Sequence, residues 1–312
     1  MVPEADGLLH EVAEDLYLVI GENGGRFPFP YSVVVTGGPN VLFDTGCGLR
    51  TLERLRERVN IDLVVNSHTH PDHFSGNHLF RGVELLVPET FAGILADLEA
   101  MSVRLAGGGE PAEQWLFMVR EILGHRPTEP TGTFVEGRVI EAGGYVFEAV
   151  HTPGHTVDTY CFYDPVSRVL LSFDYDLTPF GPWYGHVESS LPETRASIDK
   201  LIGLEPGLVV SSHRMPLSSG VEEAFREYDA VIDRRTEVVL GMLEKGPATP
   251  EQLADLSPIY GLKPSFALYH YFESRLIEKH LELLVEEGLA SMDESGTYSI
   301  KREITSTIIS HL

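Results

Sequence analysis

The chain has 312 residues, of which 43% are hydrophobic and 22% charged, as expected for a globular protein with one large domain and a small appendage. It carries 47 acidic against 23 basic residues, a formal net charge of −24. Nucleic-acid binding and docking on an anionic membrane both rely on clustered basic side chains, so this balance argues against either partner.

The first part of the chain is rich in apolar runs of strand length. Strands are expected at 16–20, 31–35 and 41–44. The glycines and proline of 36–40 predict a hairpin turn between the second and third of these strands. Leucines at helical spacing then predict a helix over 49–58, and 61–66 is expected to be a buried strand.

Helices and strands alternate in the middle of the chain. Helices are expected around 88–100 and 111–123, a long helix at 221–243, and strands at 138–150, 159–164, 168–173 and 207–212. Ser190 and Glu193 are spaced as a capping box, which predicts a further helix from Pro192. Antiparallel runs followed by alternating elements predict an α/β fold in which helices cover two sheets.

Gly246-Pro247 marks a boundary, which divides the chain into a large domain over 1–245 and a small module over 246–312. Within the module, Thr249 and Gln252 predict a capping box around a helix that begins at Pro250. A second helix is expected over about 265–287, and the residues that follow it predict a hairpin. Two helices followed by a small hairpin suggest a winged helix.

Three histidines and one aspartate lie within six residues in His68-Thr69-His70-Pro71-Asp72-His73, directly after a predicted strand. Imidazole and carboxylate are the ligands that zinc takes when thiolates are absent. Alternate residues leaving a strand point the same way, so His68 and His70 can bind one ion. Asp72 and His73 would then face a neighbouring position. Each half-site needs more ligands than this loop supplies.

Three further ligand-type residues follow apolar strands later in the chain. They are His155, Asp174 and His213. A polar surface loop would explain one such residue, whereas the whole set at successive strand ends favours a metal site. His151 lies near the same Pro-Gly turn as His155 but has no place in the ligand count, so we expect it to be structural.

The histidine loop is similar to the H-x-H-x-D-H signature of the metallo-β-lactamase superfamily, which includes glyoxalase II-like hydrolases. The resemblance covers about residues 10–240, with Asp44-Thr45-Gly46 upstream and Pro153-Gly154-His155-Thr156 downstream. It implies an αββα sandwich with the site at one edge of the two sheets. It also implies that His68, His70 and His155 hold a first metal, that Asp72, His73 and His213 hold a second, and that Asp174 bridges them.

Two positions depart from the family pattern. Phe173 stands where the family usually has glycine before the bridging aspartate, and Ser212 stands where it often has glycine before the last histidine. Phe173 leaves the register open between Asp174 and Asp176. We favour Asp174 because it follows the apolar run directly. The C-terminal module also resembles the winged helix appended to some lactamase-like hydrolases, some of which cut RNA.

Other residues are expected around the metals. Asp44 either orients a ligand imidazole or serves only as a turn residue before Gly46. Two loops rich in aromatic residues, glycine and proline are candidate pocket walls. Their side chains are Arg26 and Phe29 in the first loop and Phe180, Trp183, Tyr184 and His186 in the second. Arg26 would pair with an anionic substrate group.

The resemblance implies two divalent metal ions, most of all zinc, with iron or manganese as alternatives. A hydroxide bridging them would attack a small ester, thioester or lactone, and Asp72 would hold or accept its proton. Three rival functions remain: a phosphodiesterase or endoribonuclease using the same metals, a single-iron persulfide-dioxygenase-type oxidoreductase whose relatives keep the same signature, and a ligand-binding regulator whose winged helix binds a partner. No apolar run is long enough to span a bilayer, so we expect a cytoplasmic protein with a small-molecule substrate, and a homodimer is possible.

Overall fold

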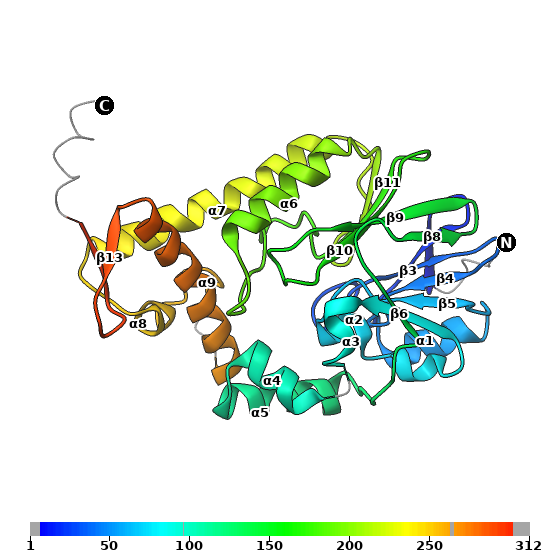
Figure 1. Cartoon of the computed structure of the whole chain (residues 1–312), viewed down its shortest axis with the longest axis horizontal. Coiled ribbons are helices and arrows are strands. Elements are labelled where there is room, and N and C mark those ends of the chain that lie inside the picture. The colour runs from blue at the N-terminus through cyan, green and yellow to red at the C-terminus, as the bar shows by residue number, and fades with distance from the viewer. Residues whose placement is uncertain (1–6, 96, 263–264, 302–312) are drawn as a thin grey trace.

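The computed structural model describes residues 7–95, 97–262 and 265–301, and two β-sheets packed face to face form its centre (Figure 1). The larger sheet is ordered β1 to β7, antiparallel through β4 and parallel from β4 to β7. Its strands are β1 (Leu9–Ala13), β2 (Leu16–Val19), β3 (Ser32–Val35), β4 (Val41–Phe43), β5 (Leu63–Val65), β6 (Glu84–Pro88) and β7 (Gly132–Phe134).

The second sheet is ordered β12-β11-β10-β9-β8, and only its pair β11 and β12 is parallel. Its strands are β8 (Val139–Ala142), β9 (Tyr145–His151), β10 (Tyr160–Asp164), β11 (Val169–Phe173) and β12 (Leu208–Ser211). Both sheets are therefore mixed. The parallel pairs matter for function, because their strands end at the same edge of a sheet.

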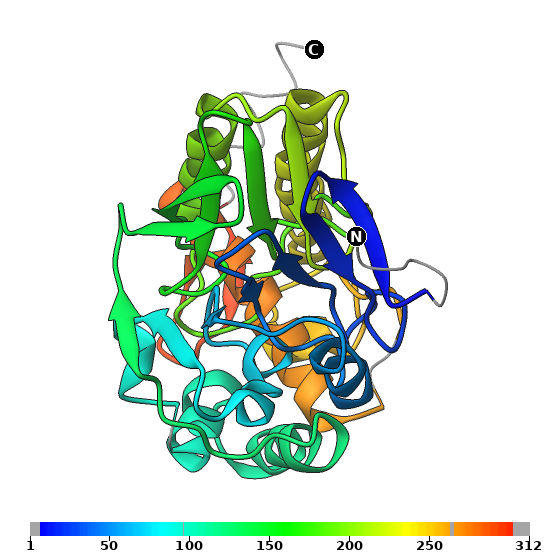
Figure 2. The ribbon, with the colours of Figure 1, turned by 90° about the vertical axis from the view of Figure 1, so that its right-hand side faces the viewer.

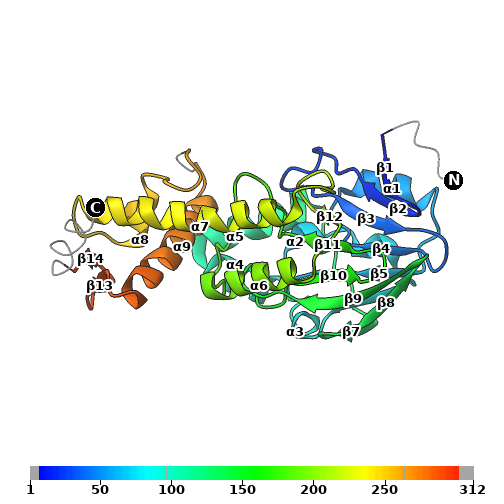
Figure 3. The ribbon, with the colours of Figure 1, turned by 90° about the horizontal axis from the view of Figure 1, so that it is seen from above.

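Helices cover the outer faces of both sheets (Figures 2 and 3). The helices before β8 are α1 (Leu49–Arg56), α2 (Pro71–Phe74), the short 3-10 helix η1 (Asn77–Phe80), α3 (Glu89–Ala92), α4 (Leu98–Ala106) and α5 (Gly109–Phe117), which continues as a π-helical turn over Met118–Ile122. Those between β11 and the C-terminal segment are α6 (Leu191–Gly203) and α7 (Val221–Leu243). Within the described residues no helix is both long enough and apolar enough to cross a membrane.

Alternation along the strands explains why both sheets are buried on two faces. In β2 and β3, Leu18 and Val33 point into the core between the sheets, whereas Tyr17 and Val34 point into the core beneath the helices. Successive strand residues face opposite sides, so a fully apolar strand needs cover on both sides. The continuous apolar runs in the sequence reflect this double burial.

The C-terminal segment forms a helical layer at one end of the sandwich (Figure 1). It contains α8 (Pro250–Ala254), α9 (Ala267–Glu286) and a hairpin of β13 (Ala290–Met292) and β14 (Tyr298–Ile300). The second half of α7 packs into this layer through Val239 and Leu243. At its other end α9 packs against α5 and α4, where Leu268 and Phe272 join the core under the larger sheet.

Most predicted elements are present, with three differences. β1, β6 and β7 were not predicted. The helix expected around 88–100 is two helices, because α3 ends at Ala92 and α4 begins only at Leu98, where the Asp97 carboxylate accepts from the Ala100 amide. The strand expected over 138–150 is two strands, β8 and β9, joined by a turn in which Gly143 has a φ of 55°.

Candidate metal centre

The proposed ligands lie together at one edge of the sandwich, although they come from both sheets. The loop 68–73 follows β5, and His155 follows β9. Asp174 follows β11 directly, and His213 lies two residues after β12. All these strands end at the same edge of the molecule, so residues up to 145 positions apart in sequence meet there.

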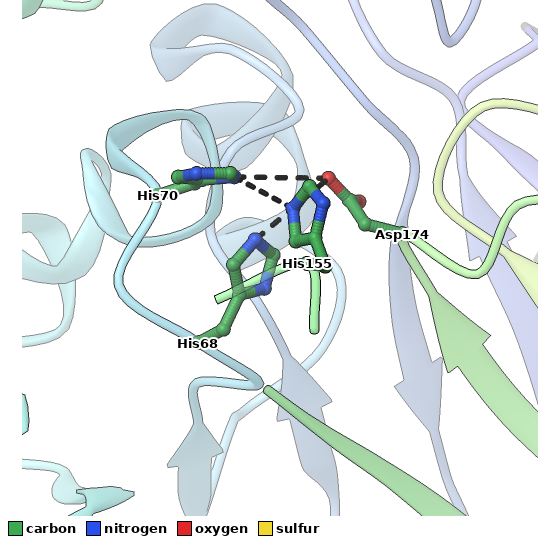
Figure 4. Close-up of side chains that lie close together, drawn as sticks. All are labelled: His68, His70, His155 and Asp174. Carbon is green, nitrogen blue, oxygen red and sulfur yellow. Dashed lines mark hydrogen bonds and ion pairs between the residues drawn. The ribbon is translucent and has the colours of Figure 1, made fainter. Parts of the chain in front are cut away.

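The first cluster consists of His68, His70, His155 and Asp174 (Figure 4). Their candidate ligand atoms all lie within 4.8 Å of one another. Nε2 of His155 is 2.9 Å from Nδ1 of His70 and 3.1 Å from Oδ2 of Asp174. The same oxygen is 3.7 Å from Nε2 of His68 and 3.9 Å from Nδ1 of His70.

The second cluster, Asp72, His73 and His213, lies against the other oxygen of Asp174. Oδ1 of Asp174 is 3.0 Å from Nε2 of His73 and 3.7 Å from Nε2 of His213. Nε2 of His73 is also 3.9 Å from Oδ2 of Asp72. One carboxylate thus presents one oxygen to each cluster, which is the arrangement a bridging ligand needs.

The backbone around Phe173 directs Asp174 toward the clusters. The pairing of β11 with β12 shifts register between Leu171 and Phe173, and Phe173 has a φ of 48°. The Ser212 amide donates to the Phe173 carbonyl at 3.0 Å, which holds the two strand ends together. Asp176 belongs to neither cluster, since its carboxylate accepts from the amide and hydroxyl of Thr178. The geometry therefore favours Asp174.

Asp44 lies under the histidine loop as a fully buried hydrogen-bond acceptor. Its carboxylate accepts from the Ser67 amide and the Ser67 hydroxyl, each at 2.7 Å, and Oδ2 is 2.7 Å from Nδ1 of His73. A Cβ on Gly46 would lie only 1.3 Å from the Asp72 carbonyl oxygen, so glycine is required for this close approach. Asp44 thus contacts a ligand ring, as expected if it orients His73.

Two imidazoles of the clusters donate to backbone carbonyls, and this sets which nitrogen faces the clusters. Nδ1 of His155 is 2.8 Å from the Trp183 carbonyl, and Nδ1 of His213 is 2.7 Å from the Gly25 carbonyl. A carbonyl only accepts, so in each ring Nδ1 carries the proton. Nε2 is therefore the nitrogen of each ring that faces its cluster and can offer a lone pair to a cation.

His70 is oriented through a second histidine. Nδ1 of His186 donates to the Leu105 carbonyl at 2.8 Å, and its Nε2 is 2.6 Å from Nε2 of His70. Burial lowers the pKa of His186 well below its usual value, so the ring is neutral and its Nε2 can only accept. Nε2 of His70 must then donate, which leaves the Nδ1 lone pair of His70 facing the first cluster.

Burial and charge act differently on the two clusters. Burial lowers the pKa of His70 to about 3, and it also lowers the pKa of His68 well below its usual value. Both rings are therefore neutral, as metal binding requires. Burial would also lower the pKa of His73, but the carboxylates of Asp174 and Asp44 outweigh it and raise that pKa. Burial opposes ionisation of Asp174, yet His73 above all lowers its pKa well below the usual range.

The donor set fits divalent cations. Within the described residues, Nε2 of His68, Nε2 of His73 and Oδ1 of Asp174 are buried without a hydrogen-bond partner. Buried polar atoms without partners are costly, and lone pairs that converge at about 3 Å repel one another. A cation within each cluster would satisfy these atoms. The two clusters are therefore consistent with a dinuclear metal site.

A cavity of about 470 Å³ opens onto both clusters. Of the side chains expected to form its wall, Arg26, Phe180, Trp183 and His186 line it. Tyr184 does not: it is fully buried on the opposite side of the loop, where its hydroxyl is 2.7 Å from Nε2 of His280. Phe29 instead packs against the core under the larger sheet. Neighbouring residues of an extended loop face opposite ways, which separates Tyr184 from Trp183.

Six further wall residues were not predicted from the sequence. They are Trp115, Met118, Tyr228, Tyr260, Tyr269 and Phe272. The last three belong to the C-terminal segment that the sequence analysis set apart as a separate module. Their aromatic type was visible in the sequence, but no local pattern places a residue of 260–272 beside the loop 68–73. His151, expected to be structural, bonds the Val157 carbonyl at 2.8 Å and is outside both clusters.

These features define a class of protein: an α/β sandwich of two mixed sheets with a two-cluster metal site at their shared edge. A family model described as the metallo-beta-lactamase superfamily matches residues 25–213. The chain therefore belongs to the metallo-beta-lactamase superfamily.

Curated relatives are distant. An atrochrysone carboxyl ACP thioesterase of Aspergillus fumigatus is 24% identical over 292 residues, which cover 87% of this chain and 80% of that protein. A lactamase-like protein of Emericella nidulans is 26% identical over 76% of this chain and 68% of its own length. An acyl-coenzyme A thioesterase of Bos taurus is 29% identical over 43% of this chain and 53% of its own length.

Solved structures share the fold. A metallo-beta-lactamase family protein from Thermus thermophilus superposes with a TM-score of 0.72 at 23% identity, covering 93% of this chain and all of that chain (100%). A beta-lactamase domain protein from Burkholderia ambifaria has the same TM-score of 0.72 at 19% identity, covering 96% of this chain and 95% of that chain. At this level of identity the likeness concerns the fold alone.

Proposed function

We propose that the chain is a metal-dependent hydrolase of thioesters, within the wider group of small esters, thioesters and lactones. The observation that carries this proposal is the position of Asp174, whose two oxygens face two separate histidine clusters at the base of a cavity. Distant relatives named as thioesterases support the choice of a thioester, since two of them align with 87% and 94% of this chain.

Two divalent cations, for which zinc suits the donors best, would supply Lewis acidity and an activated water when bound. One cation would be held by His68, His70 and His155, and the other would be held by Asp72, His73 and His213. Asp174 would contact both cations. The other steps depend on side chains of the protein. The Asp72 carboxylate is buried in the cavity wall and can hold or accept a proton there, and burial raises its pKa.

The rival functions have weaker support. A phosphodiesterase would need cationic side chains at the site, yet among the described residues that line the cavity Arg26 is the one arginine or lysine. A single-iron oxidoreductase would need only the first cluster, whereas Asp72, His73 and His213 form a second. Both observations favour a two-metal hydrolase acting on an uncharged carbonyl group.

The role of the C-terminal segment is also a proposal. From the sequence, residues 246–312 were expected to form a separate winged-helix module. Tyr260, Tyr269 and Phe272 of this segment line the cavity. We propose that the segment serves substrate binding in the same active site, with a small molecule as the partner and no nucleic acid.

The experiment compares wild-type protein with His70→Ala and Asp174→Ala on a panel of thioesters, esters and lactones. We expect each variant to lose at least about 100-fold in kcat/KM, because each loses an atom that faces a cluster. His151→Ala is the matched control, since His151 lies on β9 outside both clusters. Unchanged turnover in both ligand variants would refute the proposal. Metal analysis that finds one iron per chain would support the oxidoreductase instead.

A further inference from the structure

The cavity wall next to the first cluster is built almost entirely of aromatic rings from distant segments. They are Trp115 of α5, Phe180 and Trp183 of the loop after β11, Tyr260 of the loop after α8, and Tyr269 and Phe272 of α9. Such a wall places ring faces and ring edges on several sides of a bound molecule. It can therefore recognise shape and polarisability as well as apolar area.

The rings begin directly beside the proposed ligands. The centroid of Trp183 is 5.4 Å from that of His70 and 5.6 Å from that of His155, in both cases at a steep interplanar angle. Phe272 extends this row, with its ring 5.2 Å from Trp183 at 83°. A group bonded to a carbonyl carbon at the first cluster would therefore lie against Trp183 and Phe272.

A second pair of rings, Phe180 and Tyr260, is stacked at 5.9 Å and 19°. The indole Nε1 of Trp183 donates to the Tyr260 hydroxyl at 3.0 Å, which ties the second pair to the first. The guanidinium of Arg235 lies 4.5 Å from the Phe180 ring centroid, and the Glu273 carboxylate accepts from the Tyr260 amide at 3.1 Å. The rings are held in place before any ligand binds, so little ordering cost remains at binding.

Charge divides the cavity into two ends. Arg26 lies beside Gly25, whose carbonyl accepts from His213, so this cation is at the end of the second cluster. Within the described residues the Arg26 side chain makes no ion pair. The aromatic rings lie at the end of the first cluster, marked by His70 and His155. A substrate with one apolar arm and one polar or anionic arm would fit this division.

We propose that the substrate is a thioester with a ring-bearing, apolar acyl group, which lies against Trp183 and Phe272 while the thiol arm points toward Arg26. This inference rests on the proposed thioester hydrolysis. In that reaction a water oxygen bonds to the acyl carbon, the carbon–sulfur bond breaks, and the water proton goes to the departing sulfur. The products are an aryl-type carboxylic acid and a free thiol. The aromatic wall therefore determines acyl specificity.

The test measures binding of two non-hydrolysable thioethers of N-acetylcysteamine to zinc-loaded protein by titration calorimetry. One carries a naphthylmethyl group and the other an undecyl group, which has the same number of carbons and more apolar area. Because ring pairs add attraction beyond buried area, we expect the naphthylmethyl thioether to bind about tenfold more tightly. Both probes have an uncharged thiol arm, so Arg26 does not affect the comparison.

Tyr260→Leu and Phe272→Leu keep the wall apolar but remove a ring. Each should reduce the preference for the naphthylmethyl thioether over the undecyl thioether to about twofold or less. Phe266→Leu is the control, because this aromatic residue is 59% exposed on the same segment and is not part of the cavity wall. Two variants are used because Phe272 also packs in the core, so that Phe272→Leu by itself would not separate the loss of a wall ring from the loss of core packing.

Equal or tighter binding of the undecyl thioether would overturn the inference, and so would a preference that neither variant reduces or a failure of both thioethers to bind. These measurements need no turnover. If wild-type protein hydrolyses no thioester yet binds the naphthylmethyl probe with the expected preference, the proposed function fails while the ring-binding site stands. If it hydrolyses thioesters without the preference, only this inference fails.

Discussion

Phe173 must satisfy two opposing requirements at a single residue. Its φ of 48° lies in the left-handed region, which costs an ordinary residue about 1–2 kcal/mol. Its ring is 1% exposed and packs in the core between the sheets, 6.1 Å from the Phe162 ring and 6.4 Å from the Phe43 ring. Glycine would remove the strain but leave a large void.

Replacement of Phe173 by glycine should therefore destabilise the protein despite relieving strain. Loss of a buried phenylalanine side chain costs about 3–5 kcal/mol, and the relief returns only about 1–2 kcal/mol. We expect a net loss of about 1–4 kcal/mol in the free energy of unfolding, measured by urea denaturation. Phe173→Ala keeps the strain and loses the ring, so it should be less stable than Phe173→Gly. A glycine variant as stable as wild type would contradict this reasoning.

At the residue scale, sequence analysis could identify candidates by type and position. His68, His155 and Asp174 were recognisable because each follows an apolar strand and has a metal-binding side chain. The partner of His70 was not recognisable as such: His186 was expected only as a wall residue, and its own acceptor is the Leu105 carbonyl, 81 positions away. Any residue type supplies a carbonyl, so no sequence pattern marks this contact.

Among the elements, α9 connects the aromatic wall to the rest of the molecule. It carries Phe272 at the cavity and His280 two turns later in a buried polar network. Nε2 of His280 is 2.7 Å from the Tyr184 hydroxyl, and Nδ1 is 2.8 Å from the Thr236 hydroxyl, which itself donates to the Ile232 carbonyl. The Thr236 oxygen thus accepts from Nδ1, and Nε2 accepts from Tyr184.

Acid should weaken this attachment of α9. Burial lowers the pKa of His280 to about 3, whereas an unfolded histidine titrates near 6.5. Between these values the unfolded chain binds a proton that the folded chain does not, so the free energy of unfolding decreases as pH falls below about 6.5. The contribution of His280 to that loss from pH 7.5 to 5.5 is expected to be about 1 kcal/mol.

Urea denaturation at these two pH values tests the expectation. His280→Leu removes the titrating ring, so its loss of stability between pH 7.5 and 5.5 should be smaller than that of wild type by about 1 kcal/mol. His10→Leu, which changes an exposed histidine on β1, should have the wild-type dependence. Equal pH dependence in wild type and His280→Leu would show that His280 is not the group responsible.

Prediction of elements succeeded where the sequence has a clear period or cap. The helix that begins at Pro250 was expected from Thr249 and Gln252, and the structure has that capping box. Prediction failed where pairing with neighbouring strands determines the conformation. Residues 84–88 form a strand because they pair with β5 and β7 in the parallel part of the sheet, and such long-range pairing leaves no local pattern.

The charge of the whole molecule bears on the rival nuclease function. A net charge of −24 repels a polyanion, and the cavity has Arg26 as its one described arginine or lysine. We therefore predict no measurable binding of single-stranded or duplex RNA at about 50 mM salt, followed by fluorescence anisotropy. An affinity that is high at low salt and falls steeply with added salt would contradict this prediction and favour the nuclease.

The site requires both ends of the chain. The loop around Arg26 precedes β3, while Tyr260 and Phe272 lie more than two hundred residues later, and both border one cavity. Sequence analysis predicted the metal ligands, the sandwich and a C-terminal module over 246–312, but it did not predict which surface that module contacts. Helix and hairpin patterns predict the secondary structure of a segment. The packing of α9 against α4 and α5 depends instead on the surface that the rest of the chain forms once it has folded.

The aromatic wall also gives the protein an internal optical probe. The chain contains two tryptophans, Trp115 and Trp183, and both line the cavity. All of the indole fluorescence therefore originates at this cavity, and none comes from a distant part of the fold. Trp183 lies against the imidazoles of His70 and His155, so its emission should respond both to metal loading and to a ligand that enters the cavity. The unlabelled protein can thus report on its own site.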